Sequence, residues 1–136
     1  MILPNGTTVL VSNGHTIRLF RNKGVEPAIR LVELPDPEIS AHNQGSGGRH
    51  RTSSANPDDR RLAEDDFAAA VAEYVNGKVL GGEITTLFIV ADPRTLGEIR
   101  RHLHPSVPPV VIGELDKDLT HHPVADLQAA LAGASL

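Results

Sequence analysis

A run of glycine and basic residues is the part of this sequence best suited to chemistry. It reads Gln44-Gly45-Ser46-Gly47-Gly48-Arg49-His50-Arg51 and lies in a polar loop at about residues 38–56. Glycines lower the steric cost of unusual backbone angles, and neighbouring arginines can place guanidinium groups and backbone N–H donors against phosphates. Long polar loops inside compact domains are generally functional or disordered. We therefore predict a loop that binds nucleic acid or another partner, made by Gly45, Gly47, Gly48, Arg49, His50 and Arg51.

The start of a later helix is a secondary candidate site. Asp92-Pro93 is typical of a helix start, because Asp caps free N–H groups and Pro is favoured in the first turn. Helix N-termini favour anions, so Arg94 and Thr95 could bind one. Gly97 costs a helix up to about 1 kcal/mol relative to alanine. That cost predicts another backbone packed closely against Gly97, or a ligand near the helix start.

Metal and hydrolase chemistry find little support. The chain has seven histidines but no cysteine, and the pairs at residues 102/104 and 121/122 fall at predicted helix ends and loops. Zinc favours separated clusters or pairs four residues apart on a helix, so we predict no metal and no cofactor. A two-metal nuclease needs clustered carboxylates, and the first predicted strand contains none. A hydrolase acting on a nucleic acid or ester is therefore the third-ranked alternative.

The elements that must position these residues follow from hydrophobic patterning. We expect strands at 7–12, 15–21, 28–34, 85–91 and 110–115, and helices that begin near Pro57, Pro93 and Pro123. Their order, βββαβαβα, is that of the ribonuclease H-like α/β fold, with a mixed five-stranded sheet and three helices. No domain boundary is visible, so residues 1–136 are expected to form a single domain.

Several local features sharpen this expectation. Asn13-Gly14 predicts a type I′ hairpin turn, which needs positive φ at both residues. Asn76-Gly77 predicts a left-handed stop for the first helix. Its apolar face is expected to contain Leu62, Phe67, Val71, Tyr74 and Val75, and its exposed face to pair Arg60 and Arg61 with Glu64 and Asp65. Residues 116–120 are expected to form a hydrogen-bonded turn.

Composition limits the classes of partner. The net charge is −4, so binding to nucleic acid needs a local basic patch. The four aromatic residues are too few for base stacking along a single strand. The N-terminus lacks the pattern of a secretory signal and no window is apolar enough to span a membrane, so we expect a cytoplasmic protein. The oligomeric state, monomer or homodimer, is left open.

Three collinear segments resemble the bacterial host attachment protein family. They are MILPNGT with Gly14 and Arg18-Leu19-Phe20, PRTLGEIR at 93–100, and ELDKDLT at 114–120 followed by Pro123-Val124. That family is similar to the middle domain of archaeal and eukaryotic peptide-chain release factors. Those domains carry a Gly-Gly-Gln loop before a long helix, and the loop promotes peptidyl-tRNA hydrolysis at the ribosome.

The resemblance implies a role for the glycine-rich loop. Gly47-Gly48 stands where the Gly-Gly-Gln motif would be, but Arg49 occupies the place of the glutamine. The resemblance therefore implies a non-catalytic module that contacts the ribosome or tRNA through a Gly-Gly-Arg loop, and it leaves enzyme activity open. The alternative that the family name suggests is an attachment factor that binds a surface polysaccharide or a host protein.

Overall fold

The computed structural model of this protein describes residues 2–37, 39 and 57–133. Its strands and helices follow one another in the order that the sequence predicts, βββαβαβα. They are β1 (Thr8–Ser12), β2 (Ile17–Asn22), β3 (Leu31–Glu33), α2 (Pro57–Leu80), β4 (Leu87–Ala91), α3 (Pro93–Arg101), a short 3₁₀ turn η2 (Pro108–Val110), β5 (Val111–Leu115) and α4 (Val124–Ala132).

The five strands form one mixed sheet in the order β3-β2-β1-β4-β5. The meander β1-β2-β3 is antiparallel, whereas β1 pairs parallel with β4 and β4 pairs parallel with β5. This is the predicted ribonuclease H-like arrangement. Because Ser12 pairs with Ala91 at the last position of the β1–β4 ladder, the carboxyl ends of these two strands lie side by side.

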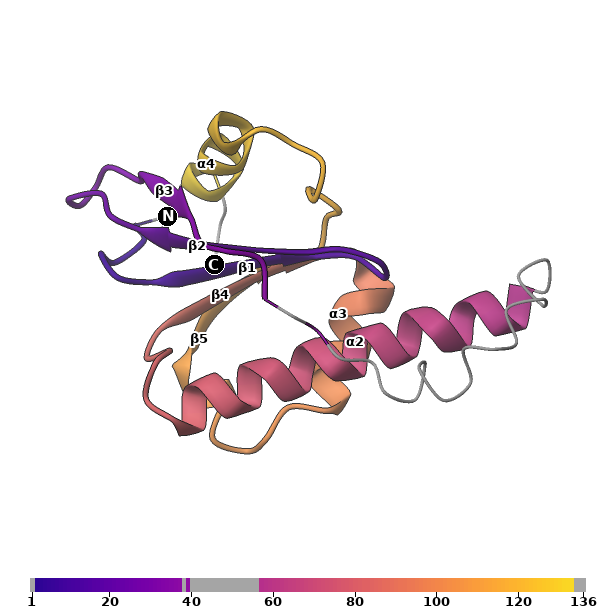
Figure 1. Cartoon of the computed structure of the whole chain (residues 1–136). Coiled ribbons are helices and arrows are strands. Elements are labelled where there is room, and N and C mark those ends of the chain that lie inside the picture. The colour runs from indigo at the N-terminus through magenta and orange to yellow at the C-terminus, as the bar shows by residue number, and fades with distance from the viewer. Residues whose placement is uncertain (1, 38, 40–56, 134–136) are drawn as a thin grey trace.

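Helices cover both faces of the sheet, with α2 and α3 on one face and α4 on the other (Figure 1). The β4 strand, Leu87–Ala91, is buried along its whole length, as its continuous apolar run predicts. Side chains of β1 and β4 alternate between two cores. One core includes Leu10, Ile89, Val71, Val75, Leu96 and Ile99, and the other includes Val9, Phe20, Phe88, Leu127 and Leu131.

The helix starts that depend on local signals are confirmed for α3 and α4. Asp92 caps α3, since its Oδ2 accepts a hydrogen bond from the Thr95 N–H at 3.1 Å. Helix α4 follows Pro123 and ends at Gly133, with Leu127 and Leu131 buried. Strand β3 is shorter than the predicted 28–34 and comprises only Leu31–Glu33.

The predicted type I′ turn at Asn13-Gly14 is wrong. Neither residue has positive φ, a conformation found in the described residues only at Gly6 and Gly82. Ser12 pairs with Ile17, which leaves a four-residue connection between β1 and β2. The Asn13 side chain organises this connection by accepting backbone hydrogen bonds, so the residue acts through its amide oxygen rather than through left-handed backbone.

Helix α2 differs from the prediction at its end and on its apolar face. It continues through Asn76 and Gly77 to Leu80, and the first residue of positive φ after it is Gly82. Asn76 instead bonds to the end of α3, donating to the His102 carbonyl and accepting from the His104 N–H. Leu62, predicted to face the core, is 60% exposed.

Among the described residues, no helix is sufficiently long and apolar to cross a membrane.

The predicted close packing of a backbone against Gly97 is also wrong. A Cβ placed on this residue would find no atom of the described residues within 4 Å, so space among them does not require glycine at this position of α3. The helix therefore carries the conformational cost of a glycine without a packing contact to compensate for it.

Candidate functional site

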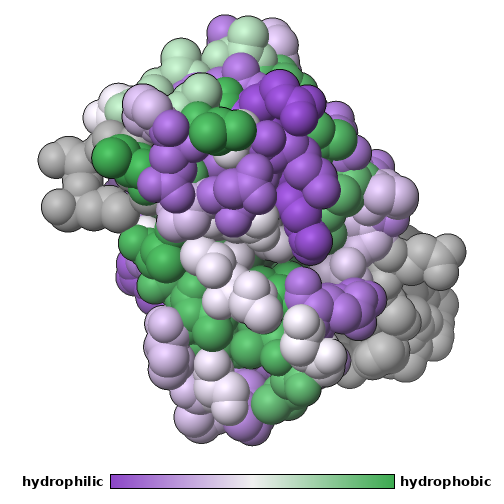
Figure 2. Space-filling view, turned by 90° about the vertical axis from the view of Figure 1, so that its left-hand side faces the viewer, coloured by the Kyte–Doolittle hydropathy of each residue, from purple (hydrophilic) through white to green (hydrophobic). Residues whose placement is uncertain are grey.

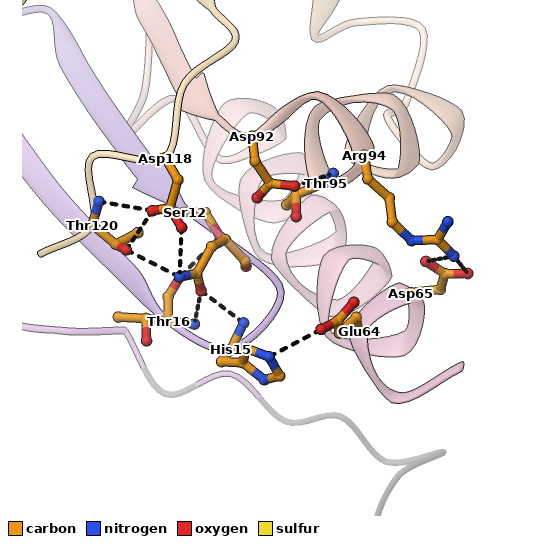
Figure 3. Close-up of polar contacts among 11 residues, drawn as sticks. Ser12, His15, Thr16, Glu64, Asp65, Asp92, Arg94, Thr95, Asp118 and Thr120 are labelled. Atoms are coloured by element: carbon orange, nitrogen blue, oxygen red, sulfur yellow. Dashed lines mark hydrogen bonds and ion pairs between the residues drawn. The ribbon is translucent and has the colours of Figure 1, made fainter. Parts of the chain in front are cut away.

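Polar side chains gather where the parallel strands β1 and β4 end. Open α/β sheets bind ligands at this end, because the loops that follow the strands meet there. Figure 3 shows the group, which comes from the loop after β1, the first turns of α2, the start of α3 and the segment after β5. We call it the carboxyl-end cluster; it consists of Ser12, Asn13, His15, Thr16, Glu64, Asp65, Asp92, Arg94, Thr95, Asp118 and Thr120.

Asn13 is the hub of the carboxyl-end cluster. Its Oδ1 accepts the backbone N–H groups of His15 and Thr16, both at 2.8 Å, which fixes the β1–β2 connection. Its Nδ2 donates to Thr120 Oγ1 at 3.0 Å and to Asp118 Oδ2 at 3.3 Å. One amide group therefore joins segments more than a hundred residues apart in the sequence.

Asp118 and Thr120 form the hydrogen-bonded turn that the sequence predicts. Asp118 Oδ1 accepts from the Thr120 backbone N–H at 3.1 Å and from its hydroxyl at 2.6 Å. Partial burial acts to raise the pKa of the Asp118 carboxyl, but the hydrogen bonds from Thr120 and Asn13, together with nearby His121, bring the pKa below its ordinary value. The carboxylate is thus held in its charged form.

Two side-chain contacts join α2 to other elements of the carboxyl-end cluster. Glu64 Oε2 lies 3.0 Å from His15 Nε2 in the β1–β2 connection. Asp65 accepts two hydrogen bonds from the Arg94 guanidinium at the start of α3, at 3.0 and 3.1 Å (Figure 3). The carboxylates predicted to pair along α2 with Arg60 and Arg61 therefore have tertiary partners, and we call these two pairs the α2 clamp.

Gly14 explains how closely α2 approaches the β1–β2 connection. A Cβ on Gly14 would lie 2.7 Å from Glu64 Cγ and 2.9 Å from Glu64 Cβ, closer than real carbon atoms pack. The glycine is needed for this contact rather than for a turn of positive φ. Sequence reasoning missed its role, because the contact joins residues that no local pattern connects.

The secondary candidate residues Arg94 and Thr95 are brought together at the start of α3, where a carboxylate already binds one nitrogen of each. Arg94 binds Asp65, and the Thr95 N–H binds Asp92. An anion at this helix start would compete with these carboxylates for the Arg94 Nη2 and Thr95 N–H donors. The second oxygen of Asp92, Oδ1, is buried and has no hydrogen-bond partner within the described part of the chain.

The primary candidate residues, Gly45 to Arg51, lie outside the described residues. The structure does describe the helix that follows them: α2 begins at Pro57, and the α2 clamp joins its second and third turns to other elements.

Within residues 2–37, 39 and 57–133, no three His, Asp or Glu side chains are grouped so as to hold a metal ion. The Ser12 Oγ lies 2.9 Å from the carbonyl oxygens of both Asn13 and Thr16, which share its one hydroxyl hydrogen, and this gives Ser12 a structural role.

Comparison with known families connects this frame to a recognised group of proteins. The sequence model of bacterial archaeo-eukaryotic release factor family 12 matches residues 6–131, which include every described strand and nearly all of α4. No curated protein matches the chain. The match supports the release-factor part of the resemblance seen in the sequence, and it does not support the host attachment part.

Proposed function

The chain belongs to bacterial archaeo-eukaryotic release factor family 12, and from this premise we propose that it is a non-catalytic module that contacts the ribosome or tRNA. The family match, which spans residues 6–131, is the observation that carries the proposal. The contact would be made by Gly45, Gly47, Gly48, Arg49, His50 and Arg51.

The proposed chemistry is recognition of phosphate rather than hydrolysis. Arginine presents a rigid fork of donors that matches phosphate oxygens, and glycines allow the backbone to approach closely. Arg49 follows Gly47-Gly48 at the place where release-factor middle domains carry glutamine. We therefore expect binding without peptidyl-tRNA hydrolysis by the mechanism of those domains.

The fixed geometry of α2 supports this role. The glycine-rich loop precedes α2, and the α2 clamp ties that helix to the β1–β2 connection and to α3. Holding one end of a binding loop lowers the entropy lost when the loop is ordered on its partner. The Glu64–His15 and Asp65–Arg94 pairs would thus orient the loop without contacting the ligand.

The test is co-sedimentation of the protein with ribosomes on sucrose gradients at low and moderate salt. We expect co-migration that weakens as salt rises, because phosphate contacts release counterions. Replacing Gly47→Val together with Arg49→Ala should abolish it. Arg101→Ala is the matched control, since this arginine is exposed on α3 and far from the loop in the sequence.

Two results would contradict the proposal. Migration of the wild-type protein only at the top of the gradient would remove the ribosome as a partner. Undiminished co-migration of the loop variant would show that other residues make the contact. Recovery of the native protein in the outer envelope would instead favour the alternative, an attachment factor that binds a surface polysaccharide or a host protein.

A further inference from the structure

A second surface, far from the carboxyl-end cluster, carries positive charge that nothing in the described structure neutralises. It lies on the hairpin that joins β2 to β3, which projects from the opposite end of the sheet (Figure 1). Its cations are Arg21, Lys23 and Arg30. No ion pair joins any of them to a described residue, whereas Arg18, Arg94, Arg100 and Arg101 each pair with a carboxylate. Arg61 and Lys117 likewise have no ion pair among the described residues, but each stands apart from these three in the sequence. We call these three residues the cationic hairpin.

The strand register places the three cations on one face. Arg21 pairs with Val32 and Asn22 with Leu31, and the Lys23 N–H continues this register by donating to the Arg30 carbonyl at 2.8 Å. Directly opposed residues of antiparallel strands point to the same side, and so do residues two apart on one strand. Lys23 and Arg30 are therefore cross-strand neighbours, with Arg21 next to Lys23 along the strand.

This arrangement is unfavourable for the folded protein alone. Like charges directly opposite one another destabilise a hairpin. Lys23 and Arg30 are both exposed and make no side-chain hydrogen bond or ion pair with described residues. Arg21 is half-buried: one terminal nitrogen donates weakly to Thr8 Oγ1 at 3.4 Å, and its Nε is buried without a partner among the described residues.

The hairpin nevertheless has a rigid frame. Asn22 is completely buried, and its Oδ1 accepts the backbone N–H groups of Gly24 and Arg30, both at 3.0 Å. Its Nδ2 donates to the Leu3 carbonyl at 2.8 Å. Gly24 is packed so tightly that a Cβ would lie 2.4 Å from the Ala28 carbonyl oxygen. The backbone that bears Lys23 and Arg30 is thus fixed before any partner arrives.

Figure 2 looks onto this end of the molecule and shows strongly hydrophilic side chains gathered in its upper half, where the β2–β3 hairpin and α4 lie. The connection also contains one acid, Glu26, and an exposed apolar residue, Val25. The three cations and Glu26 together give the hairpin a net charge of +2. This local charge opposes the net charge of −4 of the whole chain.

We propose that the cationic hairpin is a binding surface for the phosphate backbone of RNA. Successive residues on one face of a strand are about 7 Å apart and adjacent strands about 5 Å apart, so the cations are spaced for a polymer with closely repeated charges. The choice of RNA over an acidic protein rests on the proposed function. The surface itself is carried by the hairpin and does not involve the glycine-rich loop.

The test measures fluorescence anisotropy of labelled tRNA over a range of salt concentrations. We expect the double variant Lys23→Ala/Arg30→Ala to bind about tenfold more weakly and to lower the salt slope of log K by about two, one for each phosphate that a cation no longer neutralises. Glu26→Gln should bind more tightly, because it removes the acid of the connection. Arg101→Ala, which removes an exposed arginine elsewhere, should bind like the wild type.

The variants separate this proposal from the proposed function. Weaker tRNA binding by the hairpin variant alone would support the hairpin and count against the glycine-rich loop. Weaker binding by Gly47→Val/Arg49→Ala alone, with the hairpin variant unchanged, would overturn the hairpin proposal. Labelled polyglutamate that bound as tightly as tRNA and no longer bound the hairpin variant would overturn the choice of RNA. The exposed side chains of Lys23 and Arg30 make these substitutions compatible with folding, which unchanged thermal midpoints would verify.

Discussion

Two asparagines organise the two connections of the meander in different surroundings. Asn13 directly follows β1, and Asn22 is the last residue of β2. Asn13 is half-exposed, and the charged groups around it are balanced by ion pairs and hydrogen bonds to other elements. Asn22 is fully buried, and the hairpin it organises carries cations without ion-pair partners among the described residues. In both connections an asparagine amide oxygen accepts two backbone N–H groups. At Asn13 this arrangement joins separate elements of the fold, whereas at Asn22 it fixes a hairpin whose cations are not paired with described residues.

The strongest test of this comparison is Asn22→Ala. The substitution leaves the Gly24 and Arg30 N–H groups and the Leu3 carbonyl without their buried partner. We expect a loss of about 3 kcal/mol in the free energy of unfolding, because each unsatisfied buried group carries a desolvation cost. Urea denaturation followed by far-UV circular dichroism measures it. A loss below about 1 kcal/mol would show that water takes over the hydrogen bonds of the Asn22 amide. The contrast between a buried Asn22 and a half-exposed Asn13 would then no longer hold.

Gly14→Ala tests the contact between the β1–β2 connection and α2. The new Cβ would overlap Glu64, so we expect a loss of about 1–3 kcal/mol, as is typical of overpacking. Glu64→Ala in the same chain removes Cγ, the overlapping atom at the shorter distance, and keeps Cβ, so it should recover part of the loss. Additive effects in this double-mutant cycle would mean that the two residues do not touch.

Asn13→Ala should cost less than Asn22→Ala, about 1 kcal/mol, since water can reach the groups that the half-exposed amide leaves behind. The same urea denaturation measures it. Equal losses for the two substitutions would remove the distinction between an exposed hub and a buried one.

The pH dependence of Asp118 sharpens the description of the carboxyl-end cluster. Its pKa in the folded protein lies below the ordinary value of 3.8, so the carboxylate contributes stability above that pH and loses the contribution as pH falls through the lowered pKa. We expect the stability difference between the wild type and Asp118→Asn to be constant near neutral pH and to shrink in acid below 3.8. A difference independent of pH would place its origin in packing rather than in charge.

Gly97→Ala should give the smallest change, and of opposite sign. No atom in the described part of the chain lies within 4 Å of the new methyl group, and alanine favours the helix, so we expect the protein to gain up to about 1 kcal/mol. Thermal denaturation measures this gain. Destabilisation would reveal a contact that the open space around Gly97 does not show, and the contrast with Gly14 would disappear.

Sequence reasoning succeeded where local chemistry decides the structure. The Asp92-Pro93 start of α3, the strand predicted at 85–91 and the helix predicted to begin near Pro123 follow from residues close together in the chain. These signals also determine the order of elements, and with it the sheet. Local rules for connections then exclude nearly every other arrangement.

Prediction of turns and helix ends failed where residues distant in the sequence determine the local geometry. Asn13-Gly14 has the composition of a tight turn, but bonds to Thr120 and Asp118 and the approach of Glu64 determine its geometry. Asn76-Gly77 has the composition of a helix stop, but Asn76 bonds to the end of α3 and the helix continues. The α2 clamp likewise joins residues far apart in the sequence, so no spacing rule could reveal it.

The length of α2 has a mechanical consequence. Its 24 residues span about 36 Å, about twice the length of the five-residue strand β4 that it crosses, and Figure 1 shows the helix running well past the sheet. The Glu64–His15 and Asp65–Arg94 contacts lie about 10–12 Å from the start of the helix. A difference of about ten degrees in the direction of the helix axis at these contacts corresponds to about 2 Å at the helix start. The position of the helix start is therefore sensitive to the direction in which the rest of α2 is packed against the sheet.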